Sequence, residues 1–182
     1  MTNIFIIHGS GGTPQDNWFP WLKSELEKQG HHVIVPQFPT PGNQTFEKWL
    51  EVLKNYEEFL TPETIFVGHS LGATFILKIL EKFPAKAIFS VAGFIGKLGN
   101  EFDEINRDFV KQSFDREKIK QNCKHFEIFH SDNDPYIKLE KAEELARFLG
   151  IKVTLMPGAG HINESAGYTK FPLLLEKILA TD

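Results

Sequence analysis

One serine of the chain stands in a sequence that would make it a nucleophile. Residues 68–72 read Gly-His-Ser-Leu-Gly, the pattern Gly-x-Ser-x-Gly, and they follow an apolar run at 65–67. At a sharp strand-to-helix turn this pattern exposes the serine hydroxyl, and glycine is needed on both sides because larger side chains would collide. We therefore predict that Ser70 is a nucleophile on such a turn. A glycine turn with a structural role only is the alternative interpretation.

A serine nucleophile needs a base within hydrogen-bonding reach and an acid that orients the base. In the chain order serine, acid, histidine, the base is predicted to be His161, which ends the glycine-rich stretch 158–161. An exposed loop histidine is the alternative. The acid is expected in residues 131–135, Ser-Asp-Asn-Asp-Pro. We favour Asp134, because the proline after it fixes the backbone, while Asp132 is better suited to a local turn and stays the second candidate.

A glycine-rich segment, Gly-Ser-Gly-Gly at residues 9–12, follows the first apolar run of the chain. We expect the backbone N–H groups of Ser10 and Leu71 to form an oxyanion hole, which stabilises the charge that develops on a carbonyl oxygen under attack. A nucleotide-binding loop is disfavoured, because Pro14 occupies the last glycine position of the dinucleotide pattern and no Gly-Lys-Ser/Thr ending is present. A plain glycine turn is the remaining alternative.

The elements that must position these residues are short apolar runs that alternate with longer amphipathic ones. Strands are predicted at residues 4–8, 32–36, 64–68, 86–92, 125–130 and 151–156. Helices are predicted around 19–26, from a cap at Thr45 to about residue 60, and at 71–83, 139–149 and 171–179. Because the strands are mostly continuous apolar runs, we predict an α/β fold: a three-layer sandwich around a mainly parallel sheet of about six strands. In such sheets the functional loops follow the carboxyl ends of the strands.

Composition limits the classes of partner and cofactor. The chain has 182 residues, the size of one domain, which we place at 1–182. Its net charge is −4 and no stripe of Lys or Arg is present, so nucleic acid is not an expected partner. A single cysteine argues against an internal disulfide or a multi-cysteine metal site, and no metal or organic cofactor is expected. No apolar stretch approaches the ~20 residues that span a bilayer, so we expect a cytoplasmic protein.

The motifs together resemble the α/β-hydrolase superfamily, and within it the small cap-less serine hydrolases related to retinoblastoma-binding protein 9 and its bacterial homologues. The resemblance rests on residues 6–9, 17–22, 68–72, 91–94, 112–115, 132–135 and 160–161. It implies that Ser70, Asp134 and His161 are the catalytic residues. Where related proteins often have Val-Pro or Leu-Pro after the acid, this chain has Ile137-Lys138. The L-x-C-x-E motif that binds the retinoblastoma pocket is absent, so that binding role is not implied.

The predicted function is hydrolysis of small carboxylic esters through an acyl-enzyme. Residues 93–124 are too few for a large lid, and we expect His69, Phe94 and Ile137 to contact the substrate. A thioesterase or acyltransferase would use the same three catalytic residues and is the first alternative. The second alternative is a non-catalytic interaction module on a hydrolase scaffold. The sequence does not specify the oligomeric state, and a monomer is consistent with it.

Overall fold

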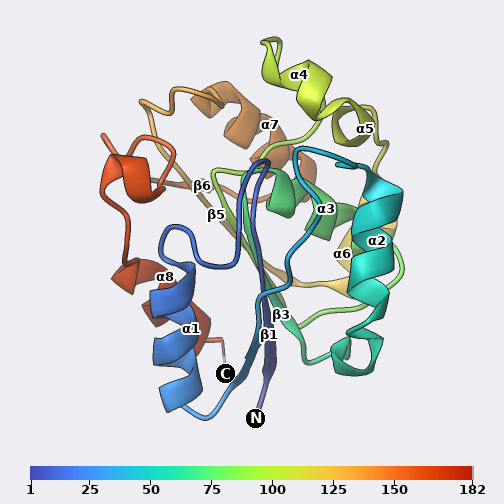
Figure 1. The fold of residues 1–182 in the computed structure, drawn as a ribbon, viewed down its shortest axis with the longest axis vertical. Coiled ribbons are helices and arrows are strands. Elements are labelled where there is room, and N and C mark those ends of the chain that lie inside the picture. The colour runs from blue at the N-terminus through green and yellow to red at the C-terminus, as the bar shows by residue number, and fades with distance from the viewer. Residues whose placement is uncertain (182) are drawn as a thin grey trace.

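The centre of the molecule is a six-stranded sheet with helices on both faces (Figure 1), described for residues 1–181 in a computed structural model. The strands are β1 (Asn3–Ile7), β2 (His32–Ile34), β3 (Ile65–His69), β4 (Ala87–Val91), β5 (His125–His130) and β6 (Val153–Leu155). Their spatial order is β2-β1-β3-β4-β5-β6, and each neighbouring pair is parallel. The predicted three-layer α/β architecture is therefore confirmed.

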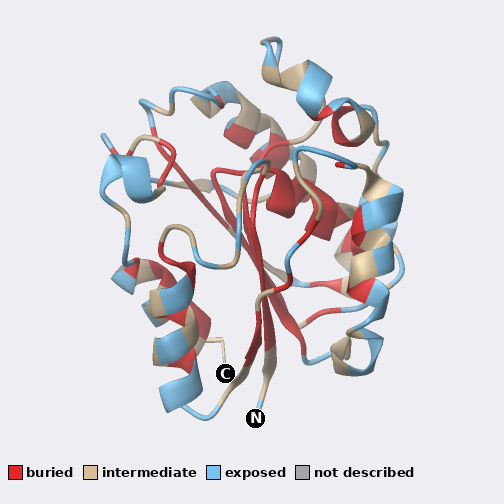
Figure 2. Ribbon diagram, viewed as in Figure 1, coloured by how far each residue is buried: buried red, intermediate tan, exposed pale blue. Residues whose placement is uncertain are grey.

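The sheet separates two buried apolar clusters. Successive side chains of a strand point to opposite faces, so in β1 Ile4 and Ile6 enter one cluster, whereas Phe5 and Ile7 enter the other. Figure 2 shows that the central strands are buried along most of their length. This burial on both faces explains why the strands appear in the sequence as continuous apolar runs rather than as alternating ones.

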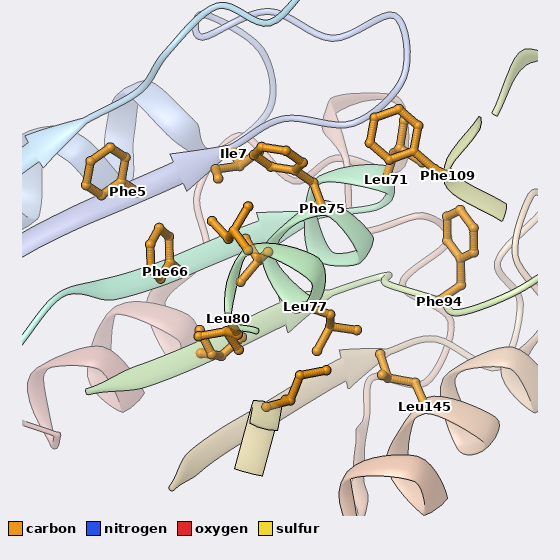
Figure 3. Packing of buried hydrophobic residues seen from close by; sticks show 14 of the residues in the cluster. Phe5, Ile7, Phe66, Leu71, Phe75, Leu77, Leu80, Phe94, Phe109 and Leu145 are labelled. Atoms are coloured by element: carbon orange, nitrogen blue, oxygen red, sulfur yellow. The ribbon is translucent and has the colours of Figure 1, made fainter. Parts of the chain in front are cut away.

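The helices divide between the two faces. On one face lie α1 (Phe19–Lys28) and α8 (Pro172–Leu179); on the other lie α2 (Phe46–Lys54), α3 (Leu71–Ile79), α6 (Arg116–Asn122) and α7 (Leu139–Leu149). Helix α3 is buried on nearly all sides, as a helix with apolar residues all round should be. Its Phe75 and Leu77 lie in the middle of the larger cluster (Figure 3). Within residues 1–181, no helix is both long enough and apolar enough to cross a bilayer.

The element boundaries differ from the predicted ones in a consistent way. Thr45 caps α2 as expected, because its hydroxyl accepts a hydrogen bond from the Lys48 N–H at 3.2 Å. However, α2 ends at Lys54 and is followed by a separate 3₁₀ turn, Glu57–Phe59. Strands β2 and β6 are shorter than predicted. Both are edge strands that pair on one side only, so fewer of their residues are held in a ladder.

Residues 93–124 contain three short helices. Helices α4 (Phe102–Ile105) and α5 (Arg107–Val110) lie beyond the carboxyl edge of the sheet, with α4 outermost at the top of Figure 1, whereas α6 packs on a face of the sheet and leads into β5. The carboxylate of Asp103 accepts hydrogen bonds from the N–H groups of Leu98 and Gly99 at 2.7 and 2.9 Å. The side chain of Asn100 donates to the Tyr136 carbonyl at 2.9 Å. The segment is thus tied down next to the loop that follows β5.

Candidate active site

Ser70 lies on the turn between β3 and α3, in a backbone conformation that side chains rarely adopt. Its φ and ψ are 54° and −121°, and its N–H donates to the Val91 carbonyl at 2.9 Å. A Cβ atom at Gly68 would lie 2.6 Å from Ala73 Cα, and one at Gly72 would lie 2.3 Å from the Ile7 carbonyl oxygen. Both glycines are therefore required by close packing, and the strained turn presents the serine at the end of the strand.

The segment 9–12, which we call the glycine loop, packs directly against Ser70. A Cβ atom at Gly9 would lie 2.8 Å from Ser70 Cβ, so only glycine allows this approach. The N–H groups of Ser10 and Leu71 donate no hydrogen bond to any residue among 1–181. Leu71 is the first residue of α3, where the helix dipole favours negative charge. Two free donors therefore stand beside the serine.

Asp134 and His161 form a buried hydrogen-bonded pair. Asp134 Oδ2 lies 2.7 Å from His161 Nδ1, and Asp134 Oδ1 accepts from the N–H groups of Tyr136 and Ile137 at 2.9 and 3.0 Å. Burial by itself would raise the pKa of Asp134, but these hydrogen bonds and the charge of His161 hold its pKa below the ordinary value. The ionised carboxylate requires a proton on Nδ1, which leaves Nε2 of the imidazole as an acceptor.

Two side chains before Asp134 hold the loop that carries His161. Asp132 Oδ1 accepts from the Gly158 N–H, and Asn133 Oδ1 accepts from the Gly160 N–H, both at 2.8 Å. Asp132 therefore binds backbone and not the imidazole, so the geometry favours Asp134 of the two acid candidates. We call residues 131–137 the aspartate loop and residues 157–163 the histidine loop. The positioning function of Asn133 has no signal in the sequence.

Two further buried histidines support these loops. The ring of His69 donates from Nε2 to the His161 carbonyl at 3.0 Å and packs edge-on against the His161 ring, with centroids 4.8 Å apart. Burial, together with repulsion from His161, lowers the pKa of His69 to about 3, so its ring stays neutral. His130 donates to the Ile137 carbonyl at 2.9 Å, and burial lowers its pKa as well. The lowered pKa makes each ring a weak base, and its Nε2 is already engaged with a backbone carbonyl, so neither is suited to be the base.

Ser70 and His161 line the same cavity, which has a volume of about 390 Å³. The hydroxyl of Ser70 makes no hydrogen bond to the described part of the chain, residues 1–181. In unliganded enzymes such hydrogen bonds are often long and tighten only when substrate binds. The two side chains therefore share a site without being joined in this state.

The remaining cavity wall has an apolar side and a polar side. The apolar side is formed by Phe94, Leu98, Phe102, Tyr136 and Ile137, and the polar side includes Ser10, Asn17, Asn106 and Asn163. The three residues that we expected to contact substrate, His69, Phe94 and Ile137, all border the cavity. Tyr136, whose ring centroid is 5.0 Å from that of His161, and Asn106 were not predicted.

The other reactive groups lie away from this cavity. Cys123 is buried, and burial raises the pKa of its thiol to about 11, which keeps it protonated. Among residues 1–181, no three His, Cys, Asp or Glu side chains are grouped so that they could hold a metal ion.

The sheet order, the glycine-flanked turn and the loops at its carboxyl edge define an α/β-hydrolase. The chain belongs to the serine hydrolase family, whose model matches residues 4–180. It is 30% identical over 177 residues to YdeN of Bacillus subtilis, covering 95% of this chain and 92% of the relative. It is 28% identical over 167 residues to the serine hydrolase RBBP9 of Rattus norvegicus, covering 90% and 89%.

Solved structures show the same fold. The crystal structure of the B. subtilis ydeN gene product has a TM-score of 0.91 at 29% identity, with 100% of this chain and 98% of that chain covered. Est1E from Butyrivibrio proteoclasticus has a TM-score of 0.72 at 18% identity, covering 99% and 88%. The resemblance to small serine hydrolases that the sequence motifs indicate is thereby confirmed.

Proposed function

We propose that this serine hydrolase cleaves small carboxylic esters through an acyl-enzyme formed on Ser70, with His161 as the base and Asp134 as the acid. The observation that carries the proposal is the 2.7 Å contact between Asp134 Oδ2 and His161 Nδ1 at a cavity that Ser70 also lines. A serine on a strained turn, an oriented imidazole and two free backbone donors together satisfy the requirements of acyl transfer.

In the first half-reaction, His161 Nε2 takes the proton from Ser70 Oγ as that oxygen forms a bond to the ester carbonyl carbon. The carbonyl oxygen becomes an oxyanion, and the N–H groups of Ser10 and Leu71 donate to it. When the tetrahedral intermediate collapses, the bond to the alcohol oxygen breaks and His161 returns the proton to that oxygen. Asp134 remains ionised throughout and stabilises the imidazolium.

In the second half-reaction, water replaces the alcohol beside His161. The imidazole takes one proton of the water while the water oxygen attacks the acyl carbon, and the same two N–H groups bind the oxyanion. Collapse of this intermediate breaks the bond to Ser70 Oγ, and His161 returns the proton to the serine. The products are a carboxylic acid and the regenerated enzyme.

The cavity supports a small substrate. Its volume of about 390 Å³ lies near the lower end of the range for small-molecule sites, and its apolar side suits a short or medium acyl chain. The short helices of residues 93–124 supply part of that side without enclosing the site under a large lid.

Labelling with a fluorophosphonate probe tests the proposal, because such probes react with an activated serine. The wild-type protein and Ser24→Ala, which changes an exposed serine on α1, should be labelled, whereas Ser70→Ala should not. Circular dichroism of Ser70→Ala checks that it is folded. Labelling that persists in folded Ser70→Ala, or no labelling of the wild type, would remove the proposed mechanism.

Competition between acyl donors separates ester hydrolysis from its closest alternative. Oxygen esters and thioesters with the same acyl chain should be compared, with and without an added alcohol acceptor. A higher kcat/KM for oxygen esters, with free acid as the main product, is the expected result. Faster turnover of thioesters would identify a thioesterase, and transfer to the alcohol would identify an acyltransferase.

A further inference from the structure

Beside the glycine loop, a buried asparagine connects three separate segments of the chain. Asn106 is 4% exposed and lines the cavity. Its Oδ1 accepts hydrogen bonds from Ser10 Oγ at 2.6 Å and from Gln44 Nε2 at 2.8 Å. Both hydrogen bonds are accepted by Oδ1. The amide nitrogen, Nδ2, takes part in neither of them.

The orientation of this amide is fixed by groups whose hydrogen-bonding sense cannot change. Gln44 Nε2 also donates to the Ile105 carbonyl at 3.2 Å, and a backbone carbonyl can only accept. The hydroxyl of Thr40 accepts the Gly11 N–H at 2.6 Å and must therefore donate to Gln44 Oε1. Gln44 therefore presents its Nε2 to Asn106, whose oxygen has to be the acceptor.

Nδ2 of Asn106 is consequently a fixed donor with no partner among residues 1–181. Nδ2 is not among the fully buried side-chain atoms without a partner, so it is open to the cavity, from which an acceptor can reach it. The serine that binds Asn106 belongs to the glycine loop, whereas the leaving alcohol must lie next to His161 to receive its proton. This arrangement favours the acyl group as the part of the substrate that lies nearest to Asn106.

We propose that Asn106 Nδ2 donates a hydrogen bond to an oxygen within the acyl chain of the substrate, separate from the ester carbonyl. The inference rests on the proposed ester hydrolysis and narrows its substrate class to acyl groups that carry an ether, carbonyl or hydroxyl oxygen beyond the scissile bond. Plain alkyl acyl chains leave this donor unpaired, which is how a polar site discriminates against them.

The test compares two esters of one alcohol whose acyl chains have equal length, pentanoyl and 3-methoxypropanoyl. The measured quantity is the ratio of kcat/KM for the ether-containing ester to that for the alkyl ester. Dividing the wild-type ratio by the variant ratio cancels the intrinsic reactivity of the two esters. The ratio should fall about tenfold in Asn106→Leu, the usual effect of losing one hydrogen bond to a buried partner.

Asn106→Asp tests the donor role of Nδ2 more specifically than Asn106→Leu does. An aspartate keeps an oxygen that accepts from Ser10 and Gln44, but it replaces the free donor with a second acceptor. The variant should lose the preference for the ether and gain turnover of an ester whose acyl chain carries an ammonium group. A purely structural asparagine would change turnover of all esters by the same factor.

A remote variant tests whether the orientation matters. Gln44 does not line the cavity, and Gln44→Leu removes the donor that holds Asn106 in one orientation. It should lower the ether-to-alkyl ratio by about threefold, since part of a hydrogen bond is lost. Ile105→Ala, which changes an exposed neighbour outside the cavity, is the control and should leave the ratio unchanged.

The outcomes distinguish this inference from the proposed function. If the wild type hydrolyses both esters and the Asn106 and Gln44 variants keep its ratio, ester hydrolysis stands and the inference fails. A ratio that depends on Asn106 only when the extra oxygen is in the alcohol also overturns the assignment to the acyl side. If the wild type hydrolyses no ester of the series, the proposed function fails and the inference fails with it.

Discussion

The two sides of the cavity are held in different ways. On one side, the aspartate and histidine loops are joined by side chains that bind backbone: Asn133 binds the Gly160 N–H, and His69 binds the His161 carbonyl. On the other side, side chains also bind the backbone of the glycine loop, as Thr40 does at the Gly11 N–H, but a further chain of bonds between side chains ends on Ser10, which binds Asn106. The carboxylate of Asp134 is fully buried, whereas Ser10 is only half-buried.

From this difference we expect one side of the cavity to determine the catalytic chemistry and the other side to determine which substrates are accepted. Contacts to backbone do not depend on which side chains stand in the partner loop, so the aspartate–histidine pair keeps its geometry when the cavity wall changes. Contacts between side chains change with any one substitution. Variation at Asn106 and Gln44 should therefore alter which acyl groups are accepted, while damage to the aspartate–histidine side should remove catalysis of every substrate.

The largest effect is expected from Asp134→Asn. The amide keeps an oxygen for the N–H groups of Tyr136 and Ile137 but no longer stabilises the imidazolium, so kcat should fall by about 10⁴ with all esters. Steady-state kinetics with several acyl chains measures this. Asp132→Asn keeps the acceptor for the Gly158 N–H and should lose less than about tenfold. The reverse order of the two losses would make Asp132 the acid.

The second prediction concerns the turn on which both sides depend. Gly72→Ala would place a Cβ atom 2.3 Å from the Ile7 carbonyl oxygen, a backbone atom of β1 that cannot move aside. We expect a loss of about 3 kcal/mol or more in the free energy of unfolding, measured by urea denaturation. Gly42→Ala is the matched control, since no atom lies within 4 Å of its added Cβ, and it should change the free energy of unfolding by less than about 0.5 kcal/mol.

Much of the fold and of the pair Asp134–His161 could be predicted because the signals are local. The apolar runs indicated all six strands, and the glycines around Ser70 form a motif of only five residues, although the clash that requires Gly72 is with Ile7 of β1. The order of the strands and the Asn106 network could not be predicted. Ser10 and Asn106 are 96 residues apart, and a serine next to a glycine has no feature that specifies so distant a partner.

The third prediction tests the anchoring of the histidine loop. Asn133→Ala leaves the Gly160 N–H without its acceptor, so the imidazole of His161 should lose part of its alignment. A misplacement of this kind should lower kcat by about 10- to 100-fold, with little change in KM. Asn133→Asp retains an acceptor oxygen and should restore most of kcat. Equal losses in both variants would show that the amide acts in some way other than by holding Gly160.

The smallest effect is a pH dependence of stability that compares His69 with His8, one buried histidine on each side of the cavity. The His8 ring donates to the Gly9 carbonyl and accepts from the Phe38 N–H, and burial lowers its pKa, while that of His69 is lowered to about 3. Below pH 6.5, the ordinary pKa of histidine, these two histidines bind protons in the unfolded chain but not in the native protein. The free energy of unfolding therefore falls as the pH falls.

For His69 the loss between pH 7 and pH 5 should be about 2 kcal/mol, since a histidine excluded from protonation contributes roughly 1.4 kcal/mol per pH unit below its unfolded pKa. Urea denaturation of His69→Gln and His8→Gln at several pH values measures each contribution. Both variants should flatten the slope, and His69→Gln should do so down to lower pH because its native pKa lies near 3. The pKa of Asp134 is held below its ordinary value of 3.8, so its contribution to stability is constant above about pH 5 and does not change the slope there. A slope unchanged in His69→Gln would mean that this ring takes up protons in the folded protein despite its burial.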